Sequence, residues 1–243
     1  ERRKNSSLIL NKDVIGRALL DYSNNDYTEN ITVISSISED DVIPISYLFR
    51  KEKELPKIES KALSLCKGSV LDVGAASGCH SIILKDIGFN VTSIDISQGA
   101  IEVMNARGLS SECINFYDLN KKYDTLLFLM NGIGIAGTLD GLDKFLIKAK
   151  NLLNEGGQIL LDSSDISYMF EQEDGSIWMD LNSSYYGEVV YQMKYKDSIT
   201  DKFDWLFVDF NTLRTKTSEL GFKTELVLEG DSDDYLVKLT LSS

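Results

Sequence analysis

The spacing of hydrophobic and polar positions changes repeatedly between a strand-like and a helical period along the central part of the chain. Apolar runs typical of buried strands occupy 69–73, 90–96, 112–116, 123–130 and 158–162. Helical spacing follows at 80–88, 98–108 and 139–155, the last with an apolar stripe from Leu142 to Leu153. This alternation predicts a parallel sheet with helices on both faces, joined by right-handed crossovers.

Two regions depart from this alternation. Residues 1–60 contain a helical pattern at 12–22 followed by a loop-like stretch, and residues 166–208 contain two strand-like runs at 185–196 and 202–210. A helix at 211–220 and two further strands complete the chain. We therefore predict an α/β fold with a doubly wound, seven-stranded, mostly parallel sheet and one antiparallel strand. Four segments are expected: a helical N-terminal cap or lid (1–60), a core (61–165), an antiparallel β insertion near the substrate site (166–208), and a C-terminal helix and strand pair completing the core (209–243).

Composition narrows the class of partner. The chain has 243 residues and a formal net charge of −13, and an acidic surface repels phosphate backbones, so we expect no nucleic-acid partner. No apolar run approaches the length of a membrane span, and no signal-peptide pattern follows the N-terminal charges, so no membrane partner is expected. Three widely separated cysteines and a single histidine predict no metal site and a reducing, cytoplasmic location.

The stretch VLDVGAASGCH, residues 70–80, runs from a strand into a turn with two glycines four positions apart. Such a turn lets the backbone approach a ligand, and the start of the next helix offers N–H groups and a partial positive charge. A nucleoside triphosphate loop needs a Lys-Ser or Lys-Thr pair after the second glycine, which is absent. A dinucleotide fingerprint would lack two of its three glycines. S-adenosyl-L-methionine (SAM), with a carboxylate and an ammonium group, suits this turn and the nearby acid Asp72.

LDVGAASG resembles motif I of the class I SAM-dependent methyltransferases, (D/E)xGxGxG: Asp72, Gly74 and Gly78 match, and Ala76 replaces the middle glycine. The resemblance implies a Rossmann-like fold and SAM as cofactor. It also implies a ribose-binding acid at the end of the second strand, Asp95, and an acid near the adenine, Asp118. The residues predicted to bind the cofactor are Asp72, Gly74, Ala75, Ser77, Gly78, His80, Asp95, Ile96, Asp118, Leu119 and Asn131.

Each of these residues also has a structural interpretation. The two glycines can serve a tight turn alone, Asp95 can cap its strand, and Asp118 can form an Asx turn. Asp72 can hold the loop, and His80 can be a first-turn helix residue that points to solvent.

Asn131 directly follows the fourth predicted strand, where the family presents its substrate. Gly132 and Ile133 depart from the (N/D)PPY signature of adenine and amide N-methyltransferases, which argues against a nucleobase or glutamine target. Asn131 contacts cofactor or substrate, or bonds its own loop. Tyr47 or Arg50 can close on the SAM carboxylate or on an anionic substrate. Alternatively, this segment is a hydrophobic plug of Ile45, Leu48 and Phe49 that docks the N-terminal helix. Trp178 and Tyr185 can line a substrate pocket, or pack within a sheet. No catalytic residue and no oligomeric state are predicted.

The expected function is methyl transfer from SAM to a small-molecule nucleophile, or with less support to a protein side chain, by in-line displacement. The alternative is a protein of the same fold that binds SAM or a nucleoside without transferring a methyl group.

Overall fold

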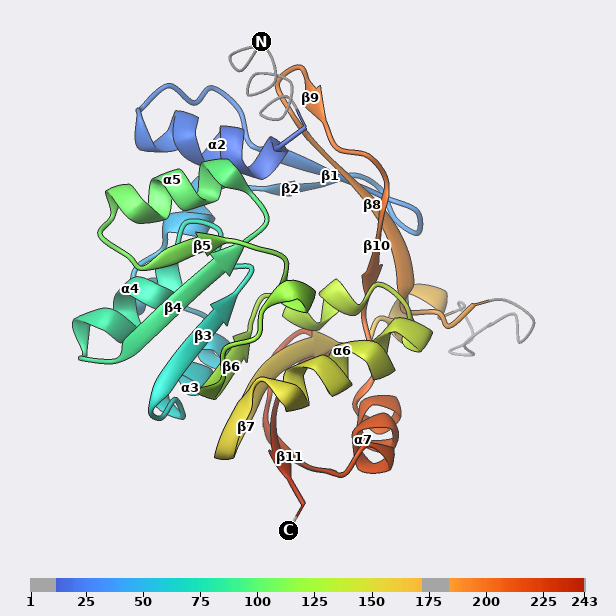
Figure 1. The fold of residues 1–243 in the computed structure, drawn as a ribbon. Helices are drawn as coiled ribbons and strands as arrows, with labels where there is room; N and C mark the ends of the chain where they lie inside the picture. The colour runs from blue at the N-terminus through green and yellow to red at the C-terminus, as the bar shows by residue number, and fades with distance from the viewer. Residues whose placement is uncertain (1–11, 172–183, 243) are drawn as a thin grey trace. The chain divides into compact units, whose positions relative to one another are not determined.

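The strand order of the computed structural model confirms the predicted fold class. The structure describes residues 12–171 and 184–242, so Trp178 lies outside the described residues. One sheet has seven strands in the order β11-β12-β7-β6-β3-β4-β5, and a second has the order β10-β8-β1-β2 with β9 paired to β8 (Figure 1). The pairs β3–β4, β4–β5 and β6–β7 are parallel, whereas β12 runs antiparallel to both β7 and β11. The seven-stranded sheet is therefore mostly parallel with one antiparallel strand.

The described residues form two compact units, and the first contains 12–55, 68–119 and 190–203. Its helices and strands are α2 (Val14–Ser23), β1 (Ile31–Ser35), β2 (Asp41–Ile43), η1 (Ile45–Phe49), η2 (Glu52–Glu54), β3 (Ser69–Val73), α4 (Cys79–Asp86), β4 (Asn90–Asp95), α5 (Gln98–Ala106), β5 (Ser111–Cys113), η3 (Phe116–Asp118), β9 (Ser198–Ile199), most of β8 (Glu188–Tyr195) and the start of β10 (Phe203–Leu206).

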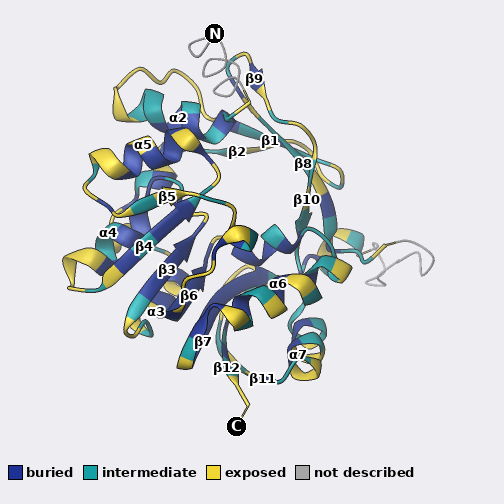
Figure 2. Cartoon of the chain, viewed as in Figure 1, coloured by how far each residue is buried: buried dark blue, intermediate teal, exposed yellow. Residues whose placement is uncertain are grey.

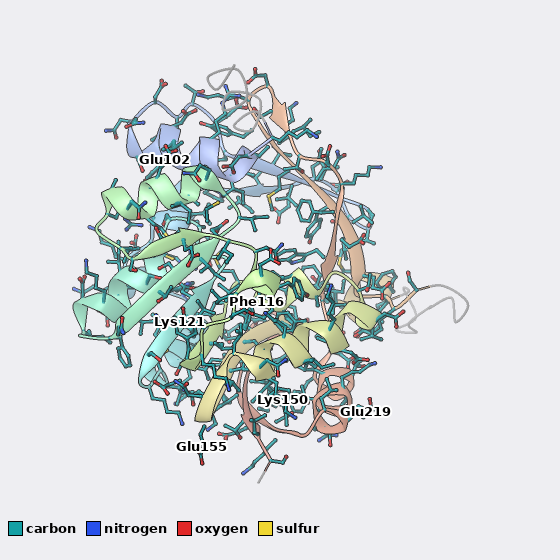
Figure 3. All side chains as sticks on the ribbon, viewed as in Figure 1. Glu102, Phe116, Lys121, Lys150, Glu155 and Glu219 are labelled. Carbon is teal, nitrogen blue, oxygen red and sulfur yellow. The ribbon has the colours of Figure 1, made fainter. Side chains whose placement is uncertain are left out.

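The core of this unit forms where the predicted apolar positions meet. β3 pairs in register with β4, Val70 opposite Val91, and four of the five β3 residues are buried. α2 and α5 pack through Ala18, Leu19, Ala100 and Met104, each fully excluded from solvent. Figure 2 shows buried residues in both helices, while Glu102 on α5 is exposed (Figure 3).

The N-terminal segment contains more than the predicted helix and loop. β1 is a strand that pairs antiparallel with β8, Val33 opposite Met193, and also with β2. Its sequence ITVIS is rich in β-branched residues, which favour strands, but its partner lies more than 150 positions away. The N-terminal segment and the predicted β insertion thus contribute to one sheet. The four-segment division of the chain stays a prediction.

The second unit contains 56–67, 120–171, 184–189 and 204–242. Its main elements are α3 (Lys57–Ser64), β6 (Tyr123–Phe128), η4 (Gly132–Ala136), α6 (Leu139–Asn151), β7 (Leu153–Ser164), η5 (Ser167–Phe170), α7 (Phe210–Glu219), β11 (Phe222–Glu229) and β12 (Asp234–Leu241). The apolar stripe of α6 is buried as predicted, and the rings of Phe128 and Phe145 meet edge to face at 4.8 Å between centroids.

Candidate active site

The glycine-bearing turn between β3 and α4 has an alternating left-handed backbone. Gly74, Ala76 and Gly78 have φ angles of +70°, +50° and +78°. The N–H groups of Gly74 and Ala75 both donate to Ile94 O, at 2.9 and 3.1 Å. The left-handed conformation is unfavourable for alanine by roughly 1–2 kcal/mol, and the N–H of Ala76 donates to Asp95 Oδ2 at 2.9 Å, which helps to hold it. The motif therefore marks three left-handed positions, including the one that lacks glycine.

The two glycines meet different surroundings. A Cβ on Gly74 would find no atom within 4 Å, so nothing but its backbone conformation restricts this residue. A Cβ on Gly78 would overlap Leu109 and come within 3.1 Å of Met104 Cγ. Gly78 also precedes α4 as its N-cap, without a side chain to cover the helix start. Gly78 is therefore needed for packing, whereas the space beside Gly74 is open.

We expect Gly74→Ala and Gly78→Ala to separate ligand binding from folding. Gly74→Ala should lower the free energy of unfolding by about 1 kcal/mol, through its positive φ alone, yet weaken SAM binding at least tenfold if the cofactor fills the adjacent space. Gly78→Ala adds overpacking and should lose roughly 2–4 kcal/mol. Urea unfolding and calorimetric titration measure the two effects. Gly156→Ala is the control, because Gly156 also has φ +70° and open space; it should lose similar stability and bind normally.

Asp95 lies at the carboxyl end of β4, and its side chain accepts a hydrogen bond from the turn. Its Oδ2 accepts the Ala76 N–H and its Oδ1 accepts the Ser97 N–H, both at 2.9 Å. Burial raises the pKa of Asp95, the hydrogen bonds from Ser97 and Ala76 lower it in part, and the charge of Asp13 raises it further. Each carboxylate oxygen has a second lone-pair site, so capping the strand and accepting further donors are compatible. The next residue, Ile96, is 75% exposed.

Asp72 and Ser77 turn their side chains into the protein. Asp72 is buried and accepts from Ser81 Oγ at 2.6 Å, and Ser81 Oγ lies 2.7 Å from Ser93 Oγ. These contacts support the interpretation that Asp72 holds the loop. Ser77 Oγ donates to Leu48 O, and Arg107 Nη1 donates to the carbonyl oxygen and Oγ of Ser77 at 2.6 and 2.9 Å.

The segment around η1 brings a cation to the start of α4. Arg50 is buried, donates to Tyr47 O at 2.5 Å, and places its guanidinium carbon 4.0 Å from the centre of the Tyr47 ring. Its Nη2 lies 3.5 Å from Nε2 of His80. His80 is 5% exposed, so the interpretation of this histidine as a residue that points to solvent is wrong. Tyr47, Arg50 and His80 are thus brought together beside the turn.

Asp118 is exposed at the end of η3, and Leu119 after it is buried. The Asp118 N–H donates to Asn115 O at 2.9 Å, and Asn115 Oδ1 accepts the Tyr117 N–H at 3.0 Å. Asn115 therefore supplies an Asx-type turn just before Asp118, and the adenine role of Asp118 stays a prediction.

Asn131, in the second unit, is held on several sides. Met130 and Asn131 have successive left-handed φ angles of +60° and +56°, an uncommon pair for residues other than glycine. The Asn131 N–H donates to Asp162 Oδ1 at 2.9 Å, its Nδ2 donates to Leu206 O at 3.0 Å, and its Oδ1 accepts from Ser163 Oγ at 2.9 Å. These bonds support the local-loop interpretation of Asn131.

Tyr185 belongs to a hydrogen-bonded cluster that the sequence analysis did not predict as a group. Its hydroxyl donates to Asp209 Oδ2 at 2.7 Å and accepts the Asp209 N–H at 3.0 Å, while the Tyr186 hydroxyl donates to Asp165 Oδ1 at 2.9 Å. Burial raises the pKa of both tyrosines far above the ordinary value, so both stay protonated. Asp209 also caps α7 through the Thr212 N–H. A capping signal before the predicted helix at 211 would have pointed to Asp209.

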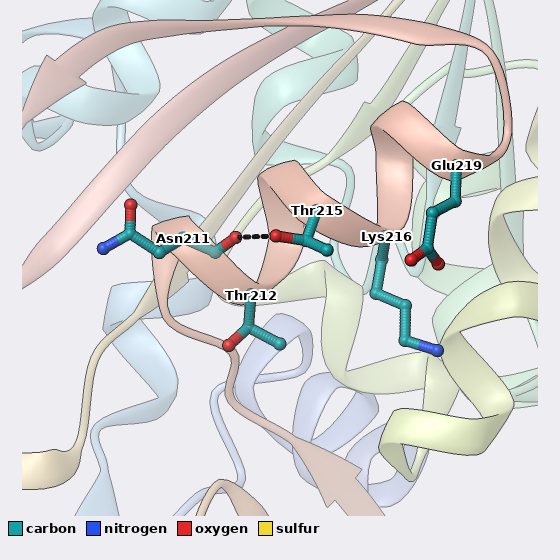
Figure 4. A pocket seen from close by; sticks show the side chains of 5 residues that line it. All are labelled: Asn211, Thr212, Thr215, Lys216 and Glu219. Carbon is teal, nitrogen blue, oxygen red and sulfur yellow. Dashed lines mark hydrogen bonds between the residues drawn. The ribbon is translucent and has the colours of Figure 1, made fainter.

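A shallow pocket on α7 is lined by Asn211, Thr212, Thr215, Lys216 and Glu219 (Figure 4), and Thr215 Oγ1 donates back to Asn211 O at 3.0 Å. Within residues 12–171 and 184–242, no three His, Cys, Asp or Glu side chains are arranged to hold a metal ion. No helix in the described part of the chain has the length and apolar composition to cross a membrane.

Comparison of the whole chain with solved structures identifies its family. A SAM-dependent methyltransferase from Bacteroides fragilis, in complex with S-adenosyl-L-homocysteine, is 43% identical, with a TM-score of 0.90 and 96% of each chain covered. The fold and the glycine turn therefore define a methyltransferase-type protein. The chain belongs to the class I SAM-dependent methyltransferase family.

More distant structures share the fold. A SAM-dependent methyltransferase from Clostridium acetobutylicum is 13% identical with a TM-score of 0.57, and CalS10 from Micromonospora echinaspora, an amino pentose methyltransferase with SAM bound, is 14% identical with a TM-score of 0.55. Each match covers 79% of this chain and 94% of the other. No family model matches the chain, and no curated protein matches it significantly by sequence.

Proposed function

We propose that this chain is an active methyltransferase that transfers a methyl group from SAM to a nucleophilic atom of a small molecule by in-line displacement. SAM is the cofactor, as the sequence predicted. The observation that carries the proposal is the left-handed turn at 74–78, with open space beside Gly74 and its middle residue bonded to the Asp95 carboxylate. The 43% identical relative, in complex with S-adenosyl-L-homocysteine, supports the same function.

The residues at the turn fit the parts of SAM. The bare backbone at Gly74 allows close approach, and the remaining lone pairs of Asp95 suit the ribose hydroxyls. The exposed side chain of Ile96 offers an apolar surface for the adenine, next to the ribose acid. The start of α4 and the guanidinium of Arg50 supply positive charge for the methionine carboxylate. Asp118, Leu119 and Asn131 remain predicted cofactor contacts.

SAM supplies a methyl group made electrophilic by the sulfonium. The contribution of the chain is to orient the cofactor and the acceptor and to exclude water, which lowers the barrier of a bimolecular displacement. The turn and Asp95 are well suited to orientation, because the N–H groups of Gly74 and Ala75 donate to Ile94 O and that of Ala76 donates to the Asp95 carboxylate. No residue is assigned as a catalytic base. Tyr185 remains a candidate for binding the acceptor.

A small-molecule acceptor agrees with the charge of the chain. A net charge of −13 disfavours nucleic acid, and Gly132 and Ile133 depart from the signature of nucleobase and amide N-methyltransferases. CalS10 is an amino pentose methyltransferase, but similarity at 14% identity supports only a shared fold and does not identify the acceptor of this chain. The proposed acceptor is therefore a small metabolite, and the proposal does not specify which of its atoms receives the methyl group.

Methyl transfer to fractionated cell extract tests the proposal. The purified chain is incubated with labelled SAM and separately with the small-molecule, protein and nucleic-acid fractions of an extract, and the labelled product is identified by mass spectrometry. We expect S-adenosyl-L-homocysteine and a methylated product with the small-molecule fraction. Tight binding of SAM by calorimetry without turnover in any fraction would instead favour the alternative, a SAM-binding protein without methyl transfer.

A further inference from the structure

Asp13, just before α2, caps two helices with one carboxylate. Its Oδ1 accepts the Gly16 N–H at 2.9 Å, in the first turn of its own helix. Its Oδ2 accepts Ser97 Oγ at 2.9 Å and the Gly99 N–H at 3.0 Å, at the start of α5. The positive ends of both helix dipoles therefore face the same negative charge, which stabilises both helix starts.

The two helix starts approach closely because both carry glycine. A Cβ on Gly99 would lie 2.6 Å from the Cα and carbonyl carbon of Gly16, which are backbone atoms that cannot move aside alone. Figure 1 shows α2 lying along α5. The packing of α2 on α5 is therefore apolar, and the close contact between the two glycines also fixes where the helices cross.

Ser97 connects this carboxylate to the candidate ribose acid. The Ser97 hydroxyl donates to Asp13 and accepts the Ala100 N–H at 2.9 Å, which caps α5, while its backbone N–H donates to Asp95 Oδ1 at 2.9 Å. The other oxygen of Asp95 holds Ala76 in its left-handed conformation. A continuous set of hydrogen bonds thus runs from Asp13 through Ser97 and Asp95 to the middle of the glycine turn.

We propose that Asp13 is a positioning residue for cofactor binding: by holding Ser97, and through it Asp95, it couples the docking of α2 on α5 to the affinity of the turn for SAM. The inference rests on the proposed role of Asp95 in binding the ribose. Coupling between two sites is reciprocal, so SAM binding also stabilises docked α2. Amide hydrogens of α2 should exchange more slowly when S-adenosyl-L-homocysteine is bound.

Asp21 provides a matched control at the other end of the same helix. It accepts Lys196 Nζ at 2.7 Å and the Tyr195 hydroxyl at 3.1 Å, so it too anchors α2, but through β8 and the turn after it rather than through α5. Replacing either aspartate with alanine removes one negative charge and one anchor of α2. Only the Asp13 variant breaks the hydrogen bonds that lead to Asp95.

Calorimetric titration with S-adenosyl-L-homocysteine measures the coupling. Asp13→Ala should weaken affinity about tenfold, within the usual 5- to 150-fold range of coupling between sites, whereas Asp21→Ala should stay within about twofold of the unchanged protein. Asp13→Asn should recover most of the affinity, because its single amide oxygen can still accept both Ser97 Oγ and the Gly99 N–H. Melting curves show whether Asp13→Ala folds; if it does not, Ser97→Ala takes its place, because it removes the hydroxyl that joins Asp13 to Ser97 and should weaken affinity in the same direction.

A double-mutant cycle distinguishes positioning from a general loss of structure. If Asp13 acts through Asp95, adding Asp13→Ala to Asp95→Ala should weaken binding by less than about twofold, because the residue through which it acts is gone. Affinity of a folded Asp13→Ala protein within twofold of the unchanged one, or a full tenfold further loss in the Asp95→Ala background, would overturn the inference. Failure of the unchanged protein to bind S-adenosyl-L-homocysteine at all would contradict the proposed function instead.

Discussion

Asp95→Ala is expected to lower the affinity for SAM about 100-fold or more. If the carboxylate accepts both ribose hydroxyls, the substitution removes two charge-assisted hydrogen bonds, each contributing roughly 1.5–3 kcal/mol, and about 1.4 kcal/mol corresponds to a tenfold change. Asp95→Asn should lie between, since the amide keeps one acceptor oxygen and loses the charge. Calorimetric titration of both variants with SAM measures the effect.

Asp95→Ala is also expected to affect folding, because the Asp95 carboxylate has partners within the protein. The carboxylate also accepts the N–H groups of Ala76 and Ser97, so the free energy of unfolding should fall by about 1–3 kcal/mol as well. Melting curves without ligand measure that loss separately. Asp86→Ala, at an exposed position of α4, is the charge-matched control and should change neither quantity.

The pH dependence of binding gives an independent check on Asp95. Its ionised form accepts hydrogen bonds, and burial raises its pKa, so affinity should decline on acidification at a higher pH than for an ordinary aspartate. Asp95→Asn cannot titrate and should lose this dependence. A folded Asp95→Ala protein that binds SAM normally would show that this acid serves only its strand and turn.

Gly99→Ala is expected to lower the free energy of unfolding by about 1–3 kcal/mol, the usual range for overpacking. This loss is opposite in sign to the gain that helix propensity alone predicts. Alanine favours helix over glycine by roughly 1 kcal/mol, so an exposed position in α5 would gain stability. At Gly99, however, the new methyl group would lie 2.6 Å from the backbone of Gly16, and α2 would have to move away from α5. Urea unfolding gives the sign directly.

The neighbouring residue supplies the control for Gly99. Gln98 is exposed in the same first turn of α5, and Gln98→Ala should change the free energy of unfolding by less than about 0.5 kcal/mol, as surface substitutions usually do. A stabilised Gly99→Ala protein would mean that the two helices adjust without loss. It would also weaken the argument that the docking of α2 is specific in position.

The sequence by itself determined the α/β core and the location of the turn. Strand and helix periods are local properties, and a glycine spacing that requires left-handed backbone is visible without any partner, which is why 74–78 was recognisable. The position of Asp95 followed from the same pattern, because it ends a strand that pairs beside β3. Even Ala76, which departs from the motif, adopts the conformation that the motif implies.

The tertiary structure decided which way the polar side chains of these segments turn. Asp72 accepts a hydrogen bond from Ser81, and Ser77 accepts one from Arg107. Asn131 is held by hydrogen bonds with Asp162, Ser163 and Leu206, which lie 31 to 75 positions away in the chain. Asp13 contacts Ser97 across 84 positions, and neither residue has a local pattern that indicates the other. Such contacts depend on how the helices and strands pack. A single sequence shows which side chains can donate or accept hydrogen bonds, but it does not show which residues they will bond.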